Sequence, residues 1–246
     1  MELIQKELLY AALGTGATCL ATVLGAAMVF FFRHAMSHIL QKAFLGFAAG
    51  VMIAASVWSL LIPAMGRGVL LPVGGGFVLG GAFLMLLDNL LPHLHIGSDE
   101  AEGLPAHWKR TTMIVLAVTL HNIPEGMAVG LSFSVAAQDP APGALAGAVA
   151  LAIGMGLQNF PEGAAVSLPM KSQGVPAGKA FLCGAASGVV EPVFGLITVL
   201  VAGSVGGMLP WVLSFAAGAM IYSHAGTLSV MGGFLVMMLL DVLLGT

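Results

Sequence analysis

Long apolar runs dominate the chain, and short segments that carry most of its charges separate one run from the next. Most runs hold about 20 residues or more, the length that an α-helix needs to cross the hydrocarbon core of a bilayer. The strict alternation of apolar and polar residues that marks membrane β-strands is absent. The pattern predicts an all-α membrane protein, one eight-transmembrane-helix bundle over residues 1–246. Its spans are expected at 8–32, 39–64, 69–92, 111–135, 142–169, 176–203, 208–222 and 226–244.

The seventh predicted span, 208–222, is shorter than the others. At 1.5 Å per residue it extends about 22 Å, less than the roughly 30 Å of the hydrocarbon core. Residues 223–226 then lead directly into the last span, although a tight turn in mid-membrane would leave backbone groups without hydrogen-bond partners. We therefore predict that a segment after Tyr222 is missing from the sequence, and a genuine half-length helix is the alternative.

Composition agrees with a chain surrounded by the lipid bilayer. Hydrophobic residues make up 59% and charged residues 8% of the sequence, and the mean hydropathy is +1.02. No soluble core accommodates so large an apolar fraction. The basic residues are few and scattered, which excludes a nucleic-acid-binding surface. Most of them fall in alternate loops on one face, so the positive-inside rule predicts that both termini lie outside.

One polar motif occurs twice inside the apolar runs. The fourth span contains His-Asn-Ile-Pro-Glu-Gly at 121–126, and the fifth contains Gln-Asn-Phe-Pro-Glu-Gly at 158–163. Pro124 and Pro161 each remove a helix hydrogen bond and displace a carbonyl. We therefore predict Pro-kinked fourth and fifth helices, and broken helices with polar side chains mark substrate sites in transporters.

The polar side chains of each motif are three or four residues apart, so they project from one side of a helix. Consecutive antiparallel spans can bring the two sets face to face. A buried carboxylate costs roughly 3 kcal/mol or more at the bilayer centre, and one divalent cation satisfies two of them. The sequence predicts a site for one ion, or for two ions that share carboxylates, and with a histidine present it suits zinc or another first-row metal. Its residues are His121, Asn122, Glu125, Gln158, Asn159 and Glu162.

Glu191 is a third glutamate deep in a span, beside Pro192. We assign it to the same cluster, and the alternative is a protonated glutamate that is hydrogen-bonded to a neighbouring helix. For the paired motifs the alternative is a structural network that only supports the kinks. That alternative is weaker, because Ser or Thr would satisfy a kink without a buried charge.

The paired motifs resemble the ZIP (Zrt/Irt-like) family of divalent metal transporters, specifically its bacterial GufA-like branch. The resemblance covers nearly the whole chain and includes Phe-Ala-Ala-Gly-Val-Met at 47–52 and Glu-Pro at 191–192. It implies a midmembrane site that moves zinc across the inner membrane of a bacterium into the cytoplasm by alternating access, as a possible homodimer. It implies that Met52, His121, Glu125, Gln158 and Glu162 bind a first ion. It also implies that Asn122, Glu125, Asn159, Glu162 and Glu191 surround a second.

Gln158 stands where many family members carry histidine. An amide oxygen binds zinc more weakly than an imidazole does, so Cd²⁺, Fe²⁺ or Mn²⁺ are also expected substrates, and the thioether of Met52 favours softer ions. Beyond the site, His93 and His95 follow the third span, with Asp88 one turn before its end. They predict a cytoplasmic release site, and ordinary solvated residues are the alternative.

The rival class is an intramembrane metal-dependent hydrolase, in which a carboxylate activates a metal-bound water. The His-Glu-x-x-His motif and a cluster of three histidines, which such a site would use, are both absent from the sequence. We therefore expect a transporter and no enzyme.

Overall fold

The computed structural model describes residues 2–32, 38–67, 70–92, 110–139, 141–204 and 207–222. Helices account for nearly all of these residues, which confirms the all-α prediction. The elements are α1 (Glu2–Ala27), η1 (Met28–Phe30), α2 (His38–Ala54), η2 (Ala55–Leu61), α3 (Ile62–Arg67), α4 (Leu70–Leu90), α5 (Arg110–Gln138), α6 (Pro142–Ser172), α7 (Ala177–Ser204) and α8 (Met208–Tyr222).

The first seven predicted spans each coincide with a helix or with a continuous run of helical segments. Within the described ranges, five stretches are long and apolar enough to cross a membrane, and α4 and α8 supply two shorter apolar helices. The chain is therefore an integral membrane protein. Helix α8 is described over Met208–Tyr222. The predicted span 226–244 and the junction after Tyr222 lie outside the described residues, so the count of eight helices stays a prediction.

The first helix begins earlier than expected, at Glu2 instead of residue 8. The polar residues near its start pair with the end of α5. Lys6 Nζ donates a 3.1 Å hydrogen bond to the carbonyl of Ala137, and the buried carboxylate of Glu7 accepts a 3.0 Å hydrogen bond from Ser134. Because these partners come from another helix, the hydropathy of the first residues alone placed the start too late.

A π-helical segment, η2, stands between α2 and α3 in one continuous helical run. Pro63 follows it closely. A proline ring clashes with the carbonyl four residues earlier, which here belongs to Ser59 within η2, and the wider π turn displaces that carbonyl. The prolines beside the three glutamates, Pro124, Pro161 and Pro192, lie inside α-helices that continue on both sides. Kinks at these positions stay predictions.

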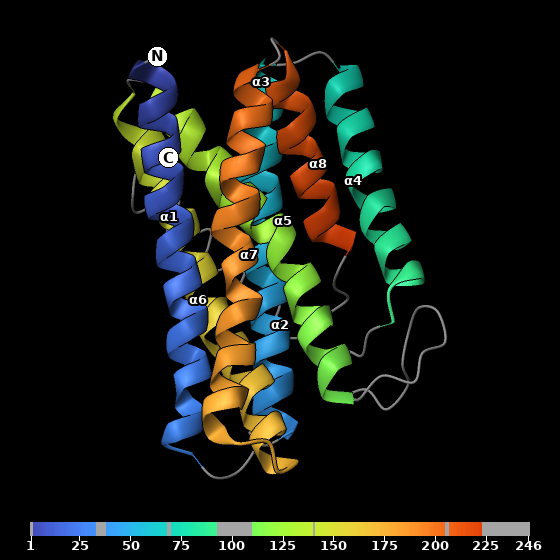
Figure 1. Cartoon of the computed structure of the whole chain (residues 1–246). Helices are drawn as coiled ribbons and strands as arrows, with labels where there is room; N and C mark the ends of the chain where they lie inside the picture. Colours follow the sequence, from blue (N-terminus) through green and yellow to red (C-terminus); the bar gives the residue numbers. More distant parts are fainter. Residues whose placement is uncertain are drawn as a thin grey trace.

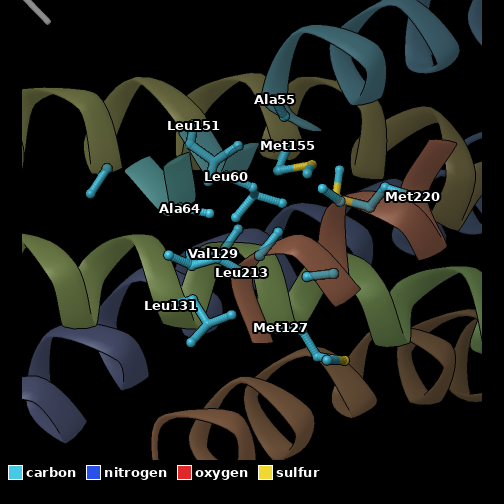
Figure 2. Packing of buried hydrophobic residues seen from close by; sticks show 14 of the residues in the cluster. Ala55, Leu60, Ala64, Met127, Val129, Leu131, Leu151, Met155, Leu213 and Met220 are labelled. Atoms are coloured by element: carbon cyan, nitrogen blue, oxygen red, sulfur yellow. The ribbon is translucent and has the colours of Figure 1, made fainter. Parts of the chain in front are cut away.

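The helices divide into two packed groups (Figure 1). Helices α1, α5, α6 and α7 pack on one another, and α4 packs on α8 beside them. The α2–η2–α3 run contacts members of both groups. An apolar core fills the space between them, with large buried side chains from α6, η2, α5 and α8 (Figure 2). The packing of α1, α5, α6 and α7 brings the two motifs and Glu191 into one region.

Candidate metal centre

The two motifs lie midway along α5 and α6, and a side-chain hydrogen bond connects them. Gln158 Nε2 donates to Glu125 Oε1 at 2.5 Å. Both side chains are fully buried. The expectation that the motifs face each other is therefore met by a direct contact between the first residue of one motif and the glutamate of the other.

Glu191 of α7 joins the same region through two hydrogen bonds. Asn159 Nδ2 donates to its Oε2 at 2.9 Å, and Thr22 Oγ1 of α1 donates to its Oε1 at 3.1 Å. All three side chains are fully buried. Helices α1, α6 and α7 thus meet at one carboxylate.

Each of the three motif amides donates a hydrogen bond from its NH₂ group to another part of the protein. The NH₂ group of Gln158 binds Glu125, that of Asn159 binds Glu191, and that of Asn122 donates a 2.8 Å hydrogen bond to the carbonyl of Ser187. The NH₂ group of each amide is therefore bound to the protein, and its oxygen points away from that hydrogen bond. In the part of the chain that the structure describes, each amide oxygen is buried and has no hydrogen-bond partner.

Two carboxylate oxygens share this condition. Glu125 Oε2 and Glu162 Oε2 are buried without a partner in the described structure. Buried acceptors are nearly always hydrogen-bonded in proteins, and leaving one unsatisfied costs about 1–3 kcal/mol. The two motifs therefore present five unsatisfied oxygen acceptors, which is the condition that a cation relieves. The five atoms are Asn122 Oδ1, Glu125 Oε2, Gln158 Oε1, Asn159 Oδ1 and Glu162 Oε2.

The three glutamates come from three different helices, α5, α6 and α7. They are not in mutual coordinating contact, since among the described residues no three His, Cys, Asp or Glu side chains could hold one metal ion together. Amides donate to two of the three carboxylates, Gln158 to Glu125 and Asn159 to Glu191. The donor set that the described helices bring together is consequently a mixture of carboxylate and amide oxygens.

The other predicted ligands occupy different surroundings. His121 is half-buried on α5, in the same motif as Glu125. Met52 lies on α2, is 2% exposed and belongs to the apolar core. Asp88 falls within α4, but its side chain is outside what the structure describes, and His93 and His95 lie outside the described residues altogether.

The glycine that ends each motif has a packing role that explains its place beside the glutamate. A Cβ on Gly126 would collide with the backbone of Glu191, and a Cβ on Gly163 would collide with the carbonyl of Thr22. Hydrogen in place of a methyl group lets α7 approach α5, and α1 approach α6, next to the buried carboxylates.

Thr22 is the site residue that the motifs do not reveal. It stands in an apolar run on α1, far from both motifs in sequence. The available signal was the spacing of Thr15, Thr18 and Thr22, which places three hydroxyls on one helix face. All three are fully buried.

The fold and this centre define a helical integral membrane protein with a buried, acceptor-rich polar site. No family model matches the chain. The chain is 37% identical to the zinc transporter ZIP11 of Homo sapiens, over 96% of this chain and 97% of that protein. It is also 37% identical to the zinc transporter ZIPB of Bordetella bronchiseptica, over 96% and 82% respectively. For the zinc transporter GufA of Myxococcus xanthus the identity is 38%, over 76% of this chain and 81% of that protein.

At this identity and coverage, the chain belongs to the ZIP family. The family resemblance drawn from the motifs is thereby confirmed. The relatives are named as transporters and not as enzymes, which also confirms the preference for transport over hydrolysis.

Proposed function

We propose that this protein carries zinc across the membrane through the polar centre between α5, α6 and α7. The observation that carries the proposal is the set of five buried, unpartnered acceptor oxygens on the two motifs. Two belong to glutamates, which supply the negative charge that a divalent ion needs after it loses water. The relatives with nearly full coverage are named zinc transporters, which supports zinc as the substrate.

The proposed ligands divide between two positions that share Glu125 and Glu162. Met52, His121 and Gln158 complete the first position, and Asn122, Asn159 and Glu191 complete the second. At the first position the Gln158–Glu125 hydrogen bond leaves Gln158 Oε1 and Glu125 Oε2 available to the ion. Glu191 keeps capacity for an ion, because each carboxylate oxygen can accept more than the single hydrogen bond it has from Thr22 or Asn159.

Substrate range follows from the donor types. Oxygen-rich sites suit Mn²⁺, imidazole suits zinc and iron, and a thioether suits softer ions such as Cd²⁺. The mixture around Gln158 therefore supports transport of Cd²⁺, Fe²⁺ or Mn²⁺ beside zinc. We further propose movement toward the cytoplasm by alternating access, in a bacterial inner membrane, with both termini outside. A homodimer and a release site at Asp88, His93 and His95 complete the proposal.

Uptake of radioactive zinc and cadmium into proteoliposomes tests this function. We expect saturable uptake by the wild type, and its loss in Glu125→Ala and in Glu162→Ala. Glu7→Gln is the matched control, because Glu7 is a buried glutamate that pairs with Ser134 outside the motifs. Calorimetry on the purified proteins reports binding separately. Binding without flux in a correctly inserted wild type would contradict the transport proposal and favour a receptor.

A further inference from the structure

Thr22 is held tightly where α1 passes between α6 and α7. Its carbonyl lies against Gly163, and its side chain lies against Gly188. A Cβ on Gly188 would stand 2.8 Å from Thr22 Cβ and 3.1 Å from Thr22 Oγ1. Because both neighbouring helices offer glycine at this point, the hydroxyl reaches a carboxylate that belongs to neither its own helix nor its sequence neighbourhood.

The hydroxyl stands at one end of a chain of oriented hydrogen bonds. Thr22 Oγ1 donates to Glu191 Oε1, and Asn159 Nδ2 donates to Glu191 Oε2. Thr18, one turn earlier on α1, donates its hydroxyl to the Thr15 carbonyl at 3.0 Å within its own helix. Since a carboxylate only accepts, Asn159 must direct its NH₂ group to Glu191 and its Oδ1 elsewhere, and that Oδ1 has no partner among the described residues.

We propose that Thr22 is a positioning residue for the transported cation. It fixes the Glu191 carboxylate, and Glu191 in turn fixes the Asn159 amide with its oxygen available to the ion. Outer-shell hydrogen bonds of this kind orient metal ligands, and their removal typically lowers metal affinity about 10- to 100-fold. The inference rests on the proposed zinc transport and adds α1 to the helices that determine its affinity.

Three substitutions on α1 separate positioning from packing. Thr22→Val removes the hydroxyl and keeps the branched shape, whereas Thr22→Ser keeps the hydroxyl and removes a methyl group. Thr15→Val is the control, because the Thr15 hydroxyl donates only a 2.7 Å hydrogen bond to the Ala11 carbonyl in its own helix. Zinc uptake into proteoliposomes gives KM and the maximal rate, and calorimetry gives the dissociation constant.

We expect Thr22→Val to raise the KM and the dissociation constant for zinc by about 10- to 100-fold. Thr22→Ser and Thr15→Val should stay close to the wild type. Wild-type KM in a folded Thr22→Val protein would overturn the inference. A loss in Thr22→Ser as large as that in Thr22→Val would also overturn it, because packing would then explain both. If the wild type itself transports no zinc, the proposed function fails, and the calorimetric comparison still tests the effect of Thr22 on binding.

Discussion

Gln158 donates a 2.5 Å hydrogen bond from its side-chain amide to Glu125 Oε1, so the first residue of one motif holds the glutamate of the other. The contact joins α5 to α6 at the centre of both helices. It also leaves Gln158 Oε1 and Glu125 Oε2 unpartnered among the described residues. An ion that enters between these side chains meets two acceptors whose positions are fixed by the hydrogen bond beside them.

Replacing Glu125 with glutamine tests the requirement for charge. Glutamine keeps the size of the side chain and an acceptor oxygen, but it removes the negative charge that offsets a divalent ion. We expect Glu125→Gln to insert and fold normally, and to lose at least about 90% of zinc uptake, as a weakening of about 1.4 kcal/mol already gives a tenfold effect. Uptake into proteoliposomes measures this. Retention of wild-type flux would contradict a role for the Glu125 charge.

Replacing Gln158 with histidine tests metal preference. An imidazole nitrogen is a better zinc ligand than an amide oxygen. We expect Gln158→His to lower the KM for zinc, by about tenfold if the gain in binding free energy is about 1.4 kcal/mol. Gln158→Leu should raise the KM for both zinc and cadmium, because it removes the acceptor. Equal KM values in all three proteins would show that residue 158 does not contact the ion.

Adding a methyl group at Gly126 tests the close approach of α5 and α7. The new Cβ would collide with the backbone of Glu191, and overpacking of this kind costs about 1–3 kcal/mol. Thermal unfolding of the detergent-purified protein should show a lowered Tm for Gly126→Ala. Gly178→Ala on α7 is the control, since no atom of another described helix lies within 4 Å of its added Cβ. An equal Tm for the two variants would mean that the helices separate easily at this point.

Acidification should slow zinc uptake. Metal ligation requires ionised carboxylates, so protons compete with zinc for Glu125 and Glu162. Uptake is expected to fall as the medium passes from neutral to mildly acid, at a constant driving force, with KM rising before the maximal rate changes. Initial rates across a pH series measure this. A flat profile would indicate that neither glutamate binds the ion in its charged form.

The sequence by itself determined the class of the protein, the first seven helices to within a few residues at most ends, and the paired motifs. Hydropathy determines the class and the helices, because each span must be apolar over its own length and must form its backbone hydrogen bonds within itself. The helical period also placed the motif side chains on common faces. The ZIP resemblance could also be drawn from the sequence, because His-Asn-Ile-Pro-Glu-Gly and its copy are short contiguous motifs.

Only the tertiary structure decided which side chains meet. The sequence paired Glu125 with Glu162 through an ion, whereas the structure gives Glu125 the amide of Gln158 and gives Glu191 the amide of Asn159. It also brought in Thr22, which is 169 positions from Glu191 in the chain. Contacts between helices depend on how far each helix slides and rotates against its neighbours. Here the glycines at 126, 163 and 188 contribute to that register, because each admits a neighbouring helix at close range.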